Sequence, residues 1–153
     1  MNSTVTFKQK IHNLYLILLQ DKIDVFRDRI TALTEDSKND AKGSAGDKHE
    51  TALSMMHLEQ ENANYKLKEF LDQKAIFDRI DPTAKHTKIA LGSLVLVNDI
   101  WVYVSTAMPK LEIENKNIFA VSPQSPLGSG LMGNLVGFVY ELNGKEYLIK
   151  EVF

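Results

Sequence analysis

Apolar side chains in the first half of the chain recur at alternating steps of three and four residues, which is the period of an amphipathic helix. The first run extends from Phe7 to Leu33, and no proline or glycine interrupts it. The second run consists of Leu53, Met56, Gln60, Ala63, Leu67, Phe70, Lys74 and Phe77. These runs predict two long helices, each with an apolar seam that a partner has to cover.

The segment between the two runs, residues 35–50, is polar and contains glycine. Such a segment predicts a turn, so we expect the second helix to fold back along the first. Pro82 disfavours helix for the residue before it, which predicts that the second helix ends near Ile80. Arms of about 30 residues would each be about 45 Å long. We therefore expect two antiparallel helices, near Thr6 to Asp36 and near Asp47 to Ile80.

Two polar residues, Gln60 and Lys74, occupy positions within the second apolar seam. A polar residue in a helical seam can fix the register of the two helices. The same residue can instead be exposed where the pairing loosens. The sequence leaves both interpretations open.

The second half of the chain has the pattern of short strands and turns. Residues 94–97 and 100–104 predict one β-hairpin, and residues 138–142 and 146–149 predict another, with Asn143-Gly144 as a strong turn signal between them. Residues 111–121 should supply further strand. The loop between them contains proline and glycine and predicts one short helix around Pro126 to Met132.

The two patterns together predict an α+β fold, in which an antiparallel coiled-coil helical hairpin precedes a small β-rich domain. We assign residues 1–80 to the hairpin, with its tip near residues 36–50. Residues 81–88 form a linker, and residues 89–153 form the β-rich domain. The linker is short and polar, so we expect the two parts to behave as separate cooperative units.

Composition excludes several kinds of chemistry. The chain of 153 residues has no cysteine, which removes disulfides, zinc–thiolate sites and thiol nucleophiles. Its net charge of −2 disfavours a protein that holds bare nucleic acid through many phosphate contacts, so a protein partner is the better expectation. The apolar run from Leu14 to Leu19 is too short to span a bilayer, and we expect a cytoplasmic monomer that does not bind membranes. His12 and His86 belong to no recognisable motif.

Two stretches resemble one protein family. Residues Gly46 to Ala52 have the spacing G-D-x-x-E-x-A, which resembles the hairpin tip of bacterial Gre-type transcript-cleavage factors. Residues Ser125 to Gly137 are similar to the S-P-L-G-x-x-L-x-G-x-x-x-G segment of the same family. The order and separation of the two stretches also fit this family, whose C-terminal domain is FKBP-like.

The resemblance implies a cofactor protein that acts on RNA polymerase and is not itself an enzyme. Gre-type factors insert the hairpin through the secondary channel, where two tip acids beside Mg²⁺ stimulate the polymerase to cleave a backtracked transcript at its 3′ end. By motif position these catalytic and metal-binding acids would be Asp47 and Glu50. The magnesium ion would be shared with the polymerase, and we expect no cofactor in the free protein. The segment that contacts the partner would contain Ser125, Pro126, Leu127 and Gly128.

Asp47 and Glu50 also have a purely structural interpretation. Asp at a helix N-cap followed by Glu three residues later resembles a capping box, which would start the second helix whatever the protein did. The tip departs from the family by lacking the usual asparagine and tyrosine, and Lys48 adds a cation between the acids. A Gre-like regulator that occupies the channel without stimulating cleavage is therefore the main alternative.

Two further functions belong to other classes. A peptidyl-prolyl isomerase would need an aromatic pocket, for which the candidates are Trp101, Tyr103, Phe119, Phe138 and Tyr140. Packing in the core of a small sheet is the simpler interpretation of these aromatic residues. A structural coiled-coil adaptor would use the hairpin alone, and it would leave the S-P-L-G stretch unexplained.

Overall fold

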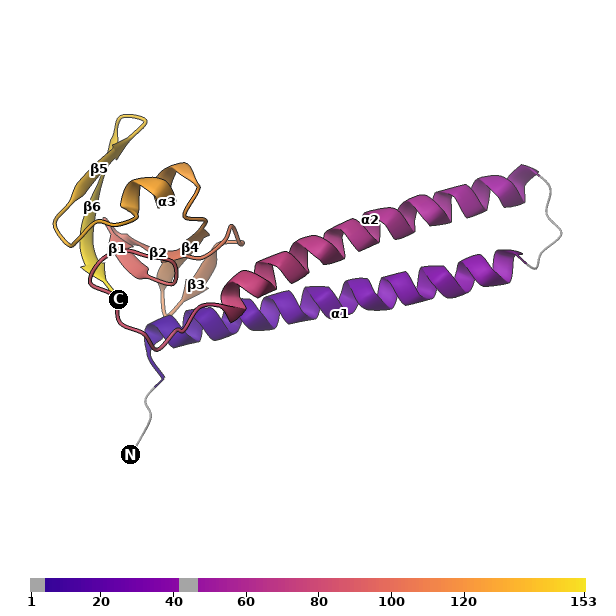
Figure 1. Ribbon diagram of the computed structural model, residues 1–153, viewed down its shortest axis with the longest axis horizontal. Coiled ribbons are helices and arrows are strands. Elements are labelled where there is room, and N and C mark those ends of the chain that lie inside the picture. The colour runs from indigo at the N-terminus through magenta and orange to yellow at the C-terminus, as the bar shows by residue number, and fades with distance from the viewer. Residues whose placement is uncertain (1–4, 42–46) are drawn as a thin grey trace. The chain divides into compact units, whose positions relative to one another are not determined.

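The computed structural model describes residues 5–41 and 47–153, and it describes side chains for residues 5–38 and 50–153 (Figure 1). Two long helices come first, and six strands with one short helix follow. The elements are α1 (Phe7–Ala41), α2 (Asp47–Asp78), β1 (Leu94–Val97), β2 (Ile100–Val104), β3 (Leu111–Ile113), β4 (Lys116–Val121), α3 (Pro126–Leu131), β5 (Val139–Leu142) and β6 (Lys145–Val152). The expected α+β class, a helical hairpin followed by a β-rich part, is confirmed.

The chain packs into two compact units whose boundaries differ from a simple division at residue 80. One unit is Leu16–Ala75, and the other combines Met1–Tyr15 with Ile76–Phe153. The first turns of α1 join the sheet because side chains such as Ile11 and Tyr15 are fully buried there. Helix α1 therefore supplies residues to both units.

Within the unit Leu16–Ala75, the contacts show that α1 and α2 are antiparallel. Phe26 lies against Phe70, with ring centroids 5.5 Å apart, whereas Thr34 further along α1 meets Gln60 earlier on α2. Gln60 Nε2 donates to Thr34 Oγ1 at 3.2 Å, so this polar position is paired across the seam. The predicted seam of α2 is buried or half-buried along its whole length.

The six strands form one sheet in the order β3-β4-β2-β1-β6-β5. Both expected hairpins are confirmed, since β1 pairs antiparallel with β2 and β5 pairs antiparallel with β6. Their turns require a positive φ, which Asn98 adopts at 53° and Asn143 at 54°; asparagine tolerates this left-handed conformation better than most residues. Residues 111–121 supply two strands, β3 and β4. Strand β4 pairs with β2 in parallel.

Alternating residues give the sheet two different faces. One face carries Val95, Val97, Val102 and Val104, which form a core with Leu131 of α3. The other face carries the side chains between them, Leu94, Trp101 and Tyr103. There the ring of Trp101 lies 5.4 Å from that of Phe7, and the ring of Tyr103 lies 6.0 Å from that of His12. The start of α1 and the short helix α3 therefore cover opposite faces.

No helix in the described ranges is both long enough and apolar enough to cross a bilayer.

The seam of the hairpin can be tested at two β-branched aliphatic residues of α1, one buried and one exposed. Ile23 is 1% exposed and Val25 is 54% exposed. We expect Ile23→Ala to lower the free energy of unfolding of the hairpin by about 2–4 kcal/mol, because it leaves a cavity in the seam. The control Val25→Ala should change it by less than about 0.5 kcal/mol. Thermal unfolding followed by circular dichroism of the helices measures both, and equal effects would contradict the assigned seam.

Candidate functional site

The tip of the hairpin falls partly outside the described residues. Helix α2 begins at Asp47, and Glu50 lies three residues further on and is exposed. Residues 42–46 and the side chain of Asp47 are not among those described. The roles of Asp47 and Glu50 as metal ligands, or as a capping box, therefore stay predictions. Among the described side chains, no group of three His, Asp or Glu residues is placed to hold a metal ion.

The S-P-L-G stretch starts the short helix that the sequence predicts. Ser125 is the N-cap of α3, and its Oγ accepts a hydrogen bond from Gly128 N at 3.0 Å. The same hydroxyl donates to Ser122 O at 2.6 Å. Pro126 occupies the first turn, where a missing N–H costs nothing. Serine and proline at these positions thus fix where the helix begins.

Two glycines in α3 are required by close packing. A Cβ at Gly128 would lie 1.9 Å from Ser122 O, and a Cβ at Gly130 would lie 2.1 Å from the ring of Tyr140. Leu127 packs against the core that contains Leu131. Ser125, Leu127 and Gly128 therefore already have internal roles, whereas Pro126 is exposed. A contact of this segment with a partner protein stays a prediction.

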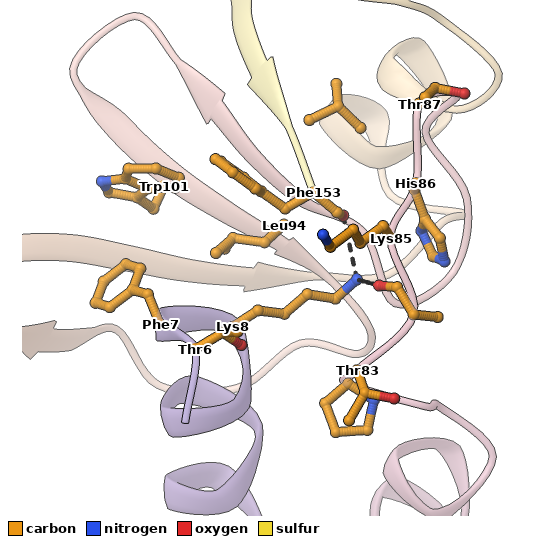
Figure 2. A pocket seen from close by; sticks show the side chains of 13 residues that line it. Thr6, Phe7, Lys8, Thr83, Lys85, His86, Thr87, Leu94, Trp101 and Phe153 are labelled. Atoms are coloured by element: carbon orange, nitrogen blue, oxygen red, sulfur yellow. Dashed lines mark hydrogen bonds between the residues drawn. The ribbon is translucent and has the colours of Figure 1, made fainter. Parts of the chain in front are cut away.

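A cavity of about 560 Å³ lies on the face of the sheet that carries Trp101. Its lining residues come from the start of α1, the segment after α2, strands β1 and β2, and the C-terminal strand. They are Thr6, Phe7, Lys8, Pro82, Thr83, Ala84, Lys85, His86, Thr87, Leu94, Trp101, Val152 and Phe153. Figure 2 shows the rings of Phe7 and Trp101 on one side of the cavity and Lys85 and His86 on the other. All of these residues belong to the same compact unit.

Lys8 is a buried cation at this cavity. Its side chain is only 4% exposed, and its Nζ donates to Ala84 O at 2.9 Å and to Phe153 O at 3.1 Å. Burial lowers the pKa of Lys8 to about 8, and the nearby carboxylate of Asp81 opposes that shift. Both acceptors are main-chain oxygens, and their hydrogen bonds stabilise the buried ammonium.

A second polar cluster lies next to Lys8 along α1. His12 Nδ1 and the hydroxyl of Tyr103 are 2.7 Å apart, and Tyr15 OH donates to Pro109 O at 3.1 Å. The ring of Phe77 lies against those of His12, Tyr15 and Tyr103. Burial lowers the pKa of His12, raises that of Tyr15 to about 12, and raises that of Tyr103 further. The neutral forms are favoured, which suits a structural cluster in the core.

Lys8 and His12 were not identified from the sequence, although their spacing contained the information. Lys8, His12, Tyr15 and Leu19 follow each other at steps of three and four residues, so they share one face of α1. All four are buried. The apolar residues assigned to this part of the helix were Phe7, Ile11, Leu14, Leu16, Leu18 and Leu19. Of these, Ile11 and Leu19 are buried and the other four are half-buried. Apolar residues alone therefore identified only part of the face that contacts the sheet.

The aromatic residues considered for a prolyl isomerase pocket do not come together. Trp101 and Tyr103 point to the face that α1 covers, and Phe119 pairs in register with Val102, whose side chain points to the opposite face. Tyr140 packs on Gly130. Phe138 is 42% exposed. The five aromatic residues therefore do not line one pocket, which the prolyl isomerase function would need.

Of the comparisons with known proteins, the one with solved structures found similar chains. No known protein family matches the chain, and no curated protein matches it. Among solved structures, the chain is similar to the GreA factor homolog 1 (Gfh1) protein of Thermus thermophilus, with 20% identity, coverage of 90% of this chain and 94% of that chain, and a TM-score of 0.35. A second structure, of the transcription factor Gfh1, matches with 19% identity, coverage of 90% and 92%, and a TM-score of 0.35.

The packing of α3 leads to a first test of the S-P-L-G stretch. We expect Gly128→Ala to lower the free energy of unfolding by about 1–3 kcal/mol, because its methyl group would collide with the main chain of Ser122. The neighbouring control Ser129→Ala is exposed and should cost much less. Urea unfolding of both variants measures the difference. A Gly128→Ala protein as stable as the parent would contradict the assigned packing.

Lys8 predicts an unusual dependence of stability on pH. The folded protein loses the Lys8 proton near pH 8, whereas the unfolded chain keeps it up to about 10.5. Within this window the unfolded state binds more protons, so the stability of the parent rises with pH. Relative to Lys8→Met, we expect a gain of about 1–2 kcal/mol between about pH 7 and pH 9.5. Urea unfolding followed by the fluorescence of Trp101, the one tryptophan, measures it. Parallel pH profiles for the two proteins would contradict this assignment.

Proposed function

We propose that this protein is a Gre-type transcription factor that binds RNA polymerase through its hairpin and stimulates cleavage of backtracked transcripts. The observation that carries the proposal is the position of the G-D-x-x-E-x-A stretch at the turn of two long antiparallel helices. Helix α1 has 35 residues and α2 has 32, so each is about 50 Å long. Helices of this length, with a polar connection, suit insertion into a deep channel.

The acids at the tip have the chemistry that the proposal requires. Asp47 and Glu50 lie three residues apart in the first turn of α2, and this spacing places two side chains on the same side of a helix. In the proposal they hold a magnesium ion at the polymerase active centre. Such an ion supplies charge stabilisation for the attacking and leaving oxygens during phosphodiester hydrolysis. The 3′ end of the nascent RNA would be the substrate, and the polymerase would remain the enzyme.

The S-P-L-G stretch supports the proposal in a different way. It starts the short helix α3 and leaves Pro126 exposed, and a set of exposed apolar residues follows α3 in the sequence. Leu135, Val136, Phe138 and Val139 are all at least 42% exposed. Exposed apolar side chains grouped along one stretch are typical of a surface that contacts another protein. We propose this surface as the second contact with the polymerase.

In a second candidate function, the protein binds RNA polymerase without stimulating transcript cleavage. The residues around the tip acids differ from the family pattern, and Lys48 lies between Asp47 and Glu50 in the sequence. A cation at this position opposes the binding of Mg²⁺ by the two carboxylates. In this alternative the hairpin occupies the channel and inhibits the polymerase.

Isosteric substitutions at the tip distinguish these functions. We expect Asp47→Asn and Glu50→Gln each to reduce cleavage of a stalled transcript by roughly 100-fold or more, because the metal needs the negative charge. Capping does not need it, so helix stability should fall by only about a few tenths of a kcal/mol. A transcript-cleavage assay with RNA polymerase measures the first effect, and a binding assay should show unchanged affinity.

The matched control is Glu61→Gln, which removes one charge from an exposed position elsewhere on α2. It should leave cleavage intact. Amide variants at Asp47 and Glu50 that cleave as well as the parent would show that the acids only start the helix. A parent protein that binds polymerase and inhibits it without cleavage would replace the first function by the second.

A further inference from the structure

The cavity beside Trp101 lies outside the proposed polymerase contacts. Its lining residues all belong to the unit that contains the sheet, and no described residue of the hairpin tip or of α3 is among them. Its volume of about 560 Å³ falls within the range of cavities that bind small molecules. The side chains around it decide which kind of molecule fits.

One wall of the cavity is aromatic. The ring centroid of Trp101 lies 5.4 Å from that of Phe7, in an edge arrangement, and 5.9 Å from that of Phe153, in a tilted one. None of the three rings is fully buried, and Phe153 is 43% exposed. Leu94 and Val152 extend this wall. Rings that still present area to solvent gain free energy when another aromatic body covers them.

Most polar side chains at the cavity already have hydrogen-bond partners within the protein. They are those of Thr6, Lys8, Thr83 and His86. The hydroxyl of Thr83 donates to Asp81 Oδ1 at 2.6 Å, and His86 Nδ1 lies 2.5 Å from Ser93 Oγ. A group whose hydrogen bond is already made gains little from a polar ligand, because it would only exchange one partner for another. The four side chains therefore favour a ligand with few polar atoms.

The other two polar lining residues, Lys85 and Thr87, are exposed. An ion pair with an exposed lysine contributes little to binding, because water and salt screen it. A charged ligand that enters the space beside the aromatic rings also loses its hydration, which is costly. An uncharged ligand avoids this cost, so the lining favours a neutral body over an ion.

We propose that this cavity binds an uncharged small molecule with an aromatic body. The body lies against Trp101, Phe7 and Phe153, where it covers ring area that is now open to solvent. Lys8 keeps its hydrogen bonds to Ala84 O and Phe153 O and contributes only its aliphatic stem. The cavity belongs to the sheet-containing unit, so its ligand is independent of whether the hairpin acts on RNA polymerase.

The probe is N-phenyl-1-naphthylamine, and the charged comparison is 8-anilino-1-naphthalenesulfonate, which has the same ring body with a sulfonate added. Both molecules become more fluorescent in apolar surroundings, so a titration of the full-length protein measures both affinities. We expect saturable binding of the neutral probe, at least about tenfold tighter than that of the sulfonate, because only the sulfonate has to lose the hydration of a charge.

A pair of matched variants locates the bound probe. Ala84→Phe adds a ring at a half-buried lining residue and should weaken binding of the neutral probe at least about tenfold, because it takes up space in the cavity. The control Ala90→Phe makes the same change at an exposed residue of the same unit, outside the lining, and should leave the affinity unchanged. Equal effects of the two variants, tighter binding of the sulfonate, or no saturable binding of the neutral probe would overturn the proposal.

The parent protein provides a test that does not depend on whether Ala84→Phe folds. Trp101 is the single tryptophan and lines the cavity, so its indole N–H gives one signal in an amide NMR spectrum. That signal should shift on addition of N-phenyl-1-naphthylamine and saturate at the same probe concentration as the fluorescence. An unmoved Trp101 signal, or shifts confined to the exposed residues Leu135, Val136 and Phe138, would overturn the proposal. So would saturable binding of an aromatic peptide where the small probe does not bind.

Discussion

The burial of Lys8 is the interaction on which the sheet-containing unit depends. Its ammonium joins three segments that are distant in the sequence: the start of α1, the segment around Ala84, and the end of the chain at Phe153. A buried charge is unfavourable unless hydrogen bonds satisfy it, so the three segments have to meet in one arrangement. The cavity exists because these segments meet around the lysine stem and leave space between them and Trp101.

Neighbouring side chains on the same face of α1 extend this constraint into the core. His12 meets the hydroxyl of Tyr103, and Tyr15 donates to the main chain of Pro109, so each polar group that this face buries has a partner. Such pairs contribute modestly to stability, but leaving one member unpaired is costly. The helix is therefore held to the sheet by specific contacts as well as by apolar area. This face also explains why residues 5–15 pack with the second half of the chain.

The two stretches that resemble Gre-type factors relate to the structure differently. The S-P-L-G stretch has a clear local role, because Ser125 caps α3 and Gly128 fits against the main chain of Ser122. Folding alone is enough to explain such a motif. The S-P-L-G stretch is therefore weak evidence for a partner. Of the two tip acids, only Glu50 has a described side chain, and it is exposed. The proposed function therefore rests more on the tip than on the sheet.

The sequence by itself determined the features that act over a few residues. The steps of three and four residues predicted both helices, the strand patterns and the Asn143-Gly144 turn predicted the hairpins, and the loop with proline and glycine predicted the short helix. Only the tertiary structure decided that β4 pairs in parallel with β2, that Lys8 is buried, and that a cavity forms beside it. The reason is physical, because these features join residues as far apart as Lys8 and Phe153, and no local period or turn signal encodes such a meeting.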